Sequence, residues 1–378
     1  MKIIIVLILG IGLFSCNQRA DEGYQLKAND KKLVFELDNQ TKSNPKALFL
    51  YKDKTGKEYL TFQNGHKNEI LFYDLKTQDF IFKVTPDLDG NNGVGRFLGY
   101  YIMNLDSILL TNSDIEEIAI VDTANCLKEQ LVYEKTSDSV SLNRSHSLTD
   151  YYRPIQEIGN KFYLISRADR RSKINPVSIT IDKVTKEVNY LPFFYPQLPI
   201  EINKAKAWGA EDFFSREFDG KRFIYSFYFD EDIYVTSIDH KSVERRKVKS
   251  RYLNKVRLLD DFGQHTFQDI CENAEYGSLI YDSYRKVYYR IVHLKTEIGR
   301  KLNDREALEL IKYGRKNFSI IIMDENLNVI GETVFPDYTY NCNVMFVHED
   351  GLYISASHAF NENYTDDNLI FHCFELVK

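Results

Sequence analysis

One strand-turn pattern recurs six times along the chain, and this repetition restricts the fold more than any other feature. In each copy, a short turn rich in Gly, Asp, Asn or Lys is followed by a strand rich in Tyr, Phe, Leu and Ile. The copies begin at residues 56, 106, 160, 220, 285 and 351, so their spacing grows from 50 to 66 residues. A repeat of this length is typical of one propeller blade. The pattern predicts an all-β, six-bladed β-propeller with four-stranded blades.

The same units contain a second pattern, an apolar strand that ends in an aspartate. These aspartates are Asp74, Asp122, Asp182, Asp239 and Asp324. Aspartate is common at the start of a turn because its carboxylate accepts hydrogen bonds from the backbone N–H groups just ahead. We therefore interpret them as turn residues and not as catalytic groups.

The two ends of the chain predict how the ring closes. The last unit reaches Lys378 after only three strand segments. The apolar run at residues 32–37 has no partner of its own, so it can supply the fourth strand and remove an exposed edge. Two stacked β-sandwich domains are the rival architecture, but no linker rich in Pro, Gly or Ser divides the chain.

One unit is longer than the others and predicts an insertion. The segment 297–316 is rich in Glu, Lys, Leu and Arg, and Leu302, Ala307, Leu308 and Ile311 recur near helical spacing. We expect a short helix inserted in blade five.

The N-terminal residues predict export and a lipid anchor. Residues 3–14 are apolar or small and follow Lys2, which is typical of a signal peptide. The sequence Leu-Phe-Ser-Cys that ends at Cys16 resembles a bacterial lipobox. We expect a signal peptide over residues 1–15, lipidation of Cys16, a tether over residues 16–24 and the propeller over residues 25–378. An ordinary secretory signal with a chance cysteine is the alternative.

By that resemblance, Asn17 in place of Asp favours an outer membrane lipoprotein, either periplasmic or surface-exposed. The 49 Lys and Arg residues against 55 Asp and Glu give a net charge of −6, which provides no basic surface for nucleic acid. The expected partners are therefore the membrane, through the anchor, and a protein or glycan.

Four further cysteines lack the spacing of a metal or redox site. They are Cys126, Cys271, Cys342 and Cys373. Each adjoins an apolar segment, so we expect free, buried thiols. A Cys271–Cys342 disulfide stays open, since an oxidising envelope permits it.

At family level, the chain resembles six-bladed, TolB-like β-propeller lipoproteins of unknown function. The resemblance rests on the lipobox at residues 13–16, the loop Asp-Gly-Asn-Asn-Gly-Val-Gly at residues 89–95, and the segment at residues 281–290. The family usually has Pro where this chain has Asn91. The resemblance covers residues 25–378 and implies no catalytic residue.

In a propeller, the loops that lead from one blade's outer strand to the next blade's inner strand line one face. Here these loops include residues 86–97, 136–153, 192–216 and 250–276. The third loop carries aromatic residues at 193–195 and the single Trp, which suits sugar or peptide binding, unless the loop packs over its own blade. From these loops, the candidate ligand-binding residues are Asn92, Arg96, Arg153, Trp208, Asp212, Arg216 and His265.

The sequence contains no motif that identifies a reaction. Asp87, Asp89 and Asn91 have the alternating spacing of a calcium loop, but Asn92 and Leu98 replace its Gly and Glu. A glycine-rich loop between blades is the simpler interpretation, and we expect no metal and no cofactor. Two hypotheses follow: a non-catalytic module that binds a protein or glycan through one rim, or an envelope carbohydrate-active lyase or hydrolase with its site in the central funnel.

Overall fold

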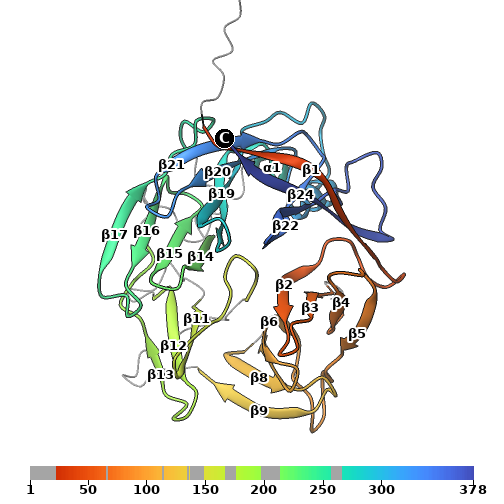
Figure 1. Ribbon diagram of the computed structural model, residues 1–378, viewed down its shortest axis with the longest axis vertical. Helices are drawn as coiled ribbons and strands as arrows, with labels where there is room; N and C mark the ends of the chain where they lie inside the picture. Colours follow the sequence, from red (N-terminus) through yellow and green to blue (C-terminus); the bar gives the residue numbers. More distant parts are fainter. Residues whose placement is uncertain are drawn as a thin grey trace, which may run out of the picture.

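Six antiparallel sheets of four strands each are arranged in a ring, as Figure 1 shows. The computed structural model describes residues 23–64, 67–112, 115–133, 136, 149–166, 176–196, 213–256 and 266–378. The predicted six-bladed propeller with four-stranded blades is therefore confirmed.

The first three blades follow one another along the chain, each running from its inner to its outer strand. Blade one consists of β2 (Lys46–Lys52), β3 (Glu58–Gln63), β4 (Ile70–Asp74) and β5 (Phe80–Val84). Blade two consists of β6 (Phe97–Asn104), β7 (Ser107–Asn112), β8 (Glu117–Val121) and β9 (Leu127–Val132). Blade three consists of β10 (Gln156–Ile158), β11 (Lys161–Ile165), β12 (Ser178–Asp182) and β13 (Val188–Tyr190).

The last three blades complete the ring, and blade six takes its outer strand from the start of the chain. Blade four consists of β14 (Phe214–Phe218), β15 (Phe223–Phe227), β16 (Asp232–Thr236) and β17 (Val243–Lys247). Blade five consists of β18 (Glu275–Asp282), β19 (Val287–His293), β20 (Phe318–Met323) and β21 (Val329–Val334). Blade six consists of β22 (Asn341–His348), β23 (Gly351–Ser355), β24 (Asn368–Val377) and β1 (Gln25–Glu36).

The position of a strand within its blade determines its composition. Strand β20, in the middle of blade five, is buried at every residue, because neighbouring blades cover both faces of its sheet. The outer strand β17 has the sequence Val-Glu-Arg-Arg-Lys and is exposed throughout. Charged side chains on an outer strand prevent edge-to-edge pairing with another molecule.

Each of the five aspartates interpreted as turn residues has this role. In the β4–β5 turn, Asp74 Oδ1 accepts hydrogen bonds from the N–H groups of Lys76 and Thr77, at 2.9 and 3.0 Å. In the β20–β21 turn, Asp324 Oδ1 accepts from Asn326 and Asn328, both at 2.9 Å. Asp122, Asp182 and Asp239 make equivalent bonds in their own turns.

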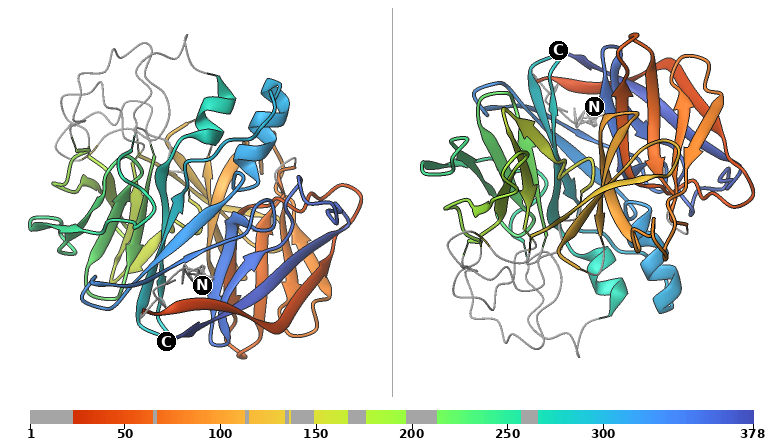
Figure 2. Two further views of the ribbon diagram at one scale, coloured as in Figure 1. Left: turned by 90° about the horizontal axis from the view of Figure 1, so that it is seen from above. Right: turned by 90° about the horizontal axis from the view of Figure 1, so that it is seen from below.

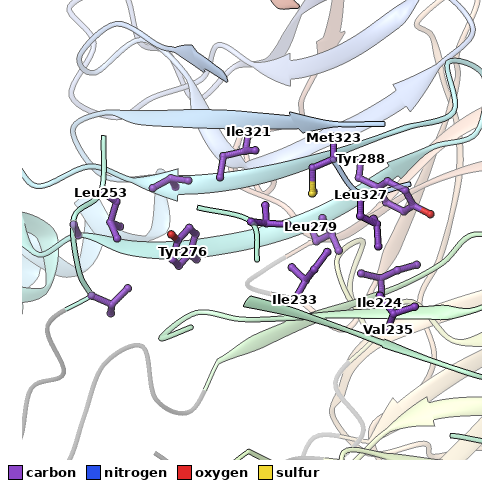
Figure 3. Packing of buried hydrophobic residues seen from close by; sticks show 14 residues of the cluster. Ile224, Ile233, Val235, Leu253, Tyr276, Leu279, Tyr288, Ile321, Met323 and Leu327 are labelled. Carbon is purple, nitrogen blue, oxygen red and sulfur yellow. The ribbon is translucent and has the colours of Figure 1, made fainter. Parts of the chain in front are cut away.

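The hydrophobic core is divided among the contacts between neighbouring blades. Figure 3 shows the cluster between blades four and five, where Ile224 and Ile233 face Tyr276, Leu279 and Ile321. Similar clusters join every other pair of neighbouring blades around the ring. Burying one such side chain contributes roughly 1.5–3 kcal/mol, so the stability of the ring comes mainly from these interfaces.

The ends of the chain pair with each other and close the ring, as predicted. Strand β1 lies antiparallel to β24, with Gln25 opposite Val377 and Glu36 opposite Asn368. On the inside of this pair, Phe35 is fully buried against blade one. Blade six is therefore built from both ends of the chain.

Two short helices in the described residues pack against each other: α1 (Phe267–Glu272) and α2 (Asp304–Lys312). Helix α2 lies between β19 and β20, which confirms the predicted insertion in blade five. Asn303 caps it, and Glu306 completes the capping box. Leu308, one of the residues near helical spacing, is 37% exposed, whereas Leu310 is fully buried. Helix α1 was not predicted.

The two faces of the ring differ. At one face, here called the turn face, where β1 begins and β24 ends, every connection between strands is a turn of two to six residues. The longer connections, both helices among them, lie at the opposite face, here called the loop face, as Figure 2 shows. Recognition by loops is thus possible at one face only.

The four cysteines in the described residues are free, and three of them are buried as expected. Cys271 Sγ donates to Ala307 O at 3.4 Å and Cys342 Sγ to Gly314 O at 3.6 Å, so no disulfide joins them. Burial raises the pKa of the Cys271 thiol to about 11. The expectation of a buried thiol is wrong for Cys126, which lies in the exposed β8–β9 turn.

This difference predicts selective labelling. In the native protein, a maleimide reagent is expected to modify Cys126 within minutes, while Cys271 and Cys342 react only after unfolding, because the reactive thiolate must be accessible. Mass spectrometry of peptides after timed labelling measures this. Equal labelling of Cys126 and Cys271 under native conditions would contradict the packing described.

Candidate functional site

A short segment of the chain, residues 149–154, lies across the central channel, and Figure 1 shows the loop before β11 inside the ring. We call it the channel segment. Its Tyr152 O accepts from Arg216 N in β14 at 2.9 Å. Its Tyr151 hydroxyl donates to Cys342 O in β22 at 3.2 Å and lies 3.5 Å from Ser278 Oγ in β18. The segment thus joins inner strands of three blades that are far apart in sequence.

Two further inner strands have local geometry that fits this segment. Gly99 in β6 has φ +93°, and a Cβ atom there would lie 1.9 Å from Thr149 O. In β2, a bulge at Ala47, with φ +44°, allows its N–H group to bond to the Asp150 carboxylate. A residue with a side chain at position 99 would collide with the channel segment.

Aromatic and polar side chains surround the channel on the loop face, at a place that we call the channel mouth. The Arg153 guanidinium lies over the rings of Tyr152 and Phe214, with Cζ 4.7 and 5.8 Å from their centroids. Tyr228, in the β15–β16 connection, forms a hydrogen bond with Ser278 Oγ at 3.0 Å. The ring of Phe213 stacks on Tyr228 with a centroid distance of 6.0 Å.

Asp150 is a carboxyl group in an unusual environment. Burial raises its pKa to about 6, although the N–H groups of Tyr151 and Ala47 and the charges of Arg153 and Lys46 oppose the shift. No hydrogen bond joins Asp150 to a second carboxyl group or a histidine in the described residues. Around Asp150, the described residues therefore show no acid pair of the kind that general acid-base hydrolysis requires.

The raised pKa predicts a pH-dependent effect of Asp150→Asn. In the unfolded chain, an aspartate has a pKa of about 3.9, whereas the pKa of Asp150 in the folded chain is about 6. Between these pH values the folded chain binds more protons than the unfolded chain, which stabilises the fold. This stabilisation is lost as the pH rises through about 6. We expect the free energy of unfolding to increase by about 1–2 kcal/mol at pH 8 and to change little at pH 4. Urea unfolding at both pH values tests this. Asp106→Asn, in an exposed turn, is the control and is expected to show no such difference between the two values.

The structure describes four of the seven candidate ligand-binding residues. Asn92 and Arg96 are exposed in the loop between blades one and two, and Arg153 lies at the channel mouth. Arg216 lies inside the fold, 1% exposed, with Nη2 donating to Pro154 O and Tyr163 O. It holds the channel segment against blade three. The remaining candidate residues, Trp208, Asp212 and His265, and the expected lipidation site, Cys16, lie outside the described residues.

The aromatic run of the third loop is divided between core and surface. Phe193 and Tyr195 are buried among the aromatic rings of blade four, as expected for a loop that packs inward. Only Phe194, which is 40% exposed, is available at the surface. The loop with calcium-like spacing closes on itself, with Val94 N donating to Asp87 O at 2.9 Å. In the described residues, no group of three or more His, Cys, Asp or Glu side chains could hold a metal ion.

A concave site opens on the turn face between blades six and one. Its volume is about 450 Å³, and its lining includes Leu33, Leu75 and Phe346. Here His348 lies between two carboxylates, with Nε2 3.4 Å from Glu58 Oε2 and Nδ1 3.5 Å from Asp350 Oδ2. Lysine side chains already pair with both carboxylates, so this site presents balanced charge.

Comparison with known proteins gives the family. A family model described as "Domain of unknown function (DUF4221)" matches residues 23–334, from the residues before β1 to the end of β21. The chain belongs to this family. The DUF4221 model therefore covers five blades and the closing strand of this chain. The expectation that the chain belongs to a propeller family of unknown function is confirmed. The TolB-like and lipoprotein parts of the resemblance stay predictions.

Two solved structures support the fold of this DUF4221 member. A DUF4221 protein from Bacteroides vulgatus ATCC 8482 has a TM-score of 0.82 at 24% identity, covering 95% of this chain and 100% of that one. A putative exported protein from Bacteroides fragilis NCTC 9343 has a TM-score of 0.56 at 10% identity, covering 95% and 97%. No curated protein matches the chain. No helix in the part of the chain that the structure describes is long and apolar enough to cross a membrane.

Proposed function

We propose that this chain is a lipid-anchored envelope protein that binds a glycan or protein partner through its loop face. The observation that carries the proposal is the contrast between the two ends of the ring. One end has only short turns, while the other combines long connections, two helices and a channel mouth closed from below by the channel segment. Such a rim offers a large, irregular surface for recognition.

An exposed apolar and basic surface on the loop face supports this proposal. Leu88 and Ile115 are each 49% exposed. Asn112 connects their turns, since its Nδ2 donates to Val94 O at 3.2 Å and its Oδ1 accepts from Ile115 N at 3.2 Å. Exposed apolar side chains beside Arg96 are typical of binding surfaces. We call Leu88, Ile115 and Arg96 the rim patch.

The position of β1 fits an anchor at the other end. The chain enters the described residues beside β21, where Tyr24 pairs with Gly331, and β1 then runs from the turn face toward the loop face. A lipid on Cys16 would hold the turn face toward the membrane and leave the rim patch accessible. This favours a tethered binding protein in the periplasm or at the cell surface.

The alternative, an envelope lyase or hydrolase, has less support. Its site was expected in the central funnel, which the channel segment crosses. The raised pKa of Asp150 is the observation in its favour, but the second acidic or histidine group needed for catalysis is not bonded to it in the described residues.

Crosslinking in intact envelopes, followed by purification of the lipidated protein, tests the proposed function. The double variant Leu88→Asp and Ile115→Asp is expected to lose most of the crosslinked partner. Val184→Asp, at a 74% exposed position on the turn face, is the matched control and should retain it. Cys16→Ala should release the protein from the membrane. Unchanged recovery with the double variant would contradict binding through the rim patch.

A further inference from the structure

Arg153 has hydrogen-bonding capacity that the described residues do not use. Its Nη2 donates to the Tyr152 hydroxyl at 3.0 Å, but its Nε is buried and has no partner. No carboxylate forms an ion pair with it in the described part of the chain. A buried, unsatisfied donor is costly and indicates a group that completes the site.

Near the channel mouth, the described basic side chains of Arg153, Arg216 and Lys46 outnumber the acidic ones, although the Asp150 carboxylate interacts electrostatically with Arg153 and Lys46. Arg216 is a second buried guanidinium, and its partners Ser178 Oγ, Pro154 O and Tyr163 O are all neutral. Lys46, at the start of β2, is exposed and forms no ion pair in the described residues. The Asp150 carboxylate accepts backbone N–H groups, while burial raises the pKa of Glu217 well above its ordinary value. The mouth thus favours an anion.

The side chains beside Arg153 indicate the kind of anion. Phe213 is 45% exposed and stacks on Tyr228, so a flat aromatic surface borders the mouth. The hydroxyls of the partly exposed Tyr152 and Tyr228 can exchange hydrogen bonds with a polyol. An aromatic surface contacts the apolar C–H face of a sugar ring, and a guanidinium pairs with a carboxylate through two parallel hydrogen bonds.

A peptide is a poorer match for this place. A peptide would be expected to add main-chain hydrogen bonds to an inner strand. At β14, the Arg216 N–H group already donates to Tyr152 O. The combination of aromatic surface, hydroxyls and unpaired guanidinium therefore favours a sugar acid over a peptide carboxylate.

We propose that the channel mouth binds an acidic glycan, with the Arg153 guanidinium paired to a uronate carboxylate and the sugar ring against Phe213. This inference deepens the proposed function, on which it rests, by naming the ligand class and a site distinct from the rim patch. The carboxylate would accept hydrogen bonds from the unused donors of Arg153. The channel segment would form the floor of this binding site.

Calorimetric titration of the full chain with uronate oligosaccharides tests the proposal. The probes are trimers of galacturonate, glucuronate and mannuronate, their methyl esters, and a peptide with a free C-terminal carboxylate. At least one uronate is expected to bind about tenfold or more tightly than its ester, because the ester keeps the sugar but lacks the charge. Failure of every uronate, equal binding of acid and ester, or preference for the peptide would overturn the proposal.

Variants locate the site. Arg153→Gln should weaken binding of the acid about tenfold or more and leave ester binding unchanged, and Arg153→Lys should restore part of the difference. Phe213→Ala should weaken acid and ester alike, which provides a test that does not alter the channel segment. Arg246→Gln, in the exposed outer strand β17, is the control and should change neither. If Arg153→Gln and Phe213→Ala both fold and still bind the acid as tightly as the unaltered protein, the uronate does not bind at the channel mouth.

The two proposals can fail separately. If the uronates do not bind but the rim-patch variant loses its crosslinked partner, the acidic-glycan site is refuted and the proposed function stands. If uronates bind through Arg153 while crosslinking to the rim patch gives no partner, the ligand is the glycan and the protein-partner form of the proposed function is refuted.

Discussion

Replacing Arg290 with leucine is expected to lower the free energy of unfolding by about 3–5 kcal/mol. The Arg290 guanidinium, in β19, is fully buried and connects blade five to blade four. It donates to the Ser226 hydroxyl and to four backbone carbonyls, those of residues 227, 230, 231 and 248. Its Cζ also lies 3.8 Å from the centroid of the Tyr276 ring. Leucine would leave the carbonyls of residues 230 and 248 without this donor, while those of residues 227 and 231 would keep only their bonds from backbone N–H groups.

Urea unfolding, followed by far-UV circular dichroism, measures this loss. Arg246→Leu is the matched control, because Arg246 lies in the outer strand β17 with half of its side chain exposed. Its replacement should change the free energy by less than about 0.5 kcal/mol. A similar small effect at Arg290 would show that the carbonyl cluster does not stabilise the interface between blades four and five.

Replacing Gly99 with alanine is expected to cost about 3 kcal/mol or more, which combines two effects. The first is backbone strain, because position 99 has φ +93°. The second is steric, because the added Cβ would lie 1.9 Å from Thr149 O and displace the channel segment. The loss of the segment's bonds to β14, β18 and β22 adds to the cost.

Gly56→Ala separates these effects. Gly56 has a similar φ of +89°, but a Cβ atom added there would have no atom of the described residues within 4 Å, apart from its own chain neighbours. It should therefore cost only the backbone contribution, about 1–2 kcal/mol. The difference between the two variants measures the contact with the channel segment. If both cost the same, the segment does not depend on close approach at position 99.

The architecture was predictable because its determinants are local in the sequence. An aspartate such as Asp74 bonds to backbone groups two and three residues ahead, so the turn is encoded within a few residues. Strands buried on both faces are continuous apolar runs, as in β20. The unpaired run at residues 32–37 predicted ring closure because a strand without a partner needs one.

The candidate site was predictable only in part. The loop position of Arg153 identified it as a candidate, but the sequence did not show that it lies over Phe214 of another blade. Arg216, at the boundary of another loop, is buried and holds the channel segment. The importance of Asp150, Tyr152 and Tyr228 was missed. The run Asp-Tyr-Tyr-Arg at residues 150–153 is an unusual combination of aromatic and charged side chains before a short strand, and it was the available signal.

The number of blades, the turns, the closing strand and the inserted helix all follow from the amino-acid sequence, because each depends on neighbouring residues or on repetition. In contrast, only the folded chain shows that residues 149–154 cross the channel. It also shows that Arg153 lies there without an acidic partner among the described residues. Contacts at the centre of a ring join residues that are far apart along the chain. Tyr151 and Cys342 are 191 residues apart in sequence yet share a hydrogen bond, and no local pattern specifies which groups meet there.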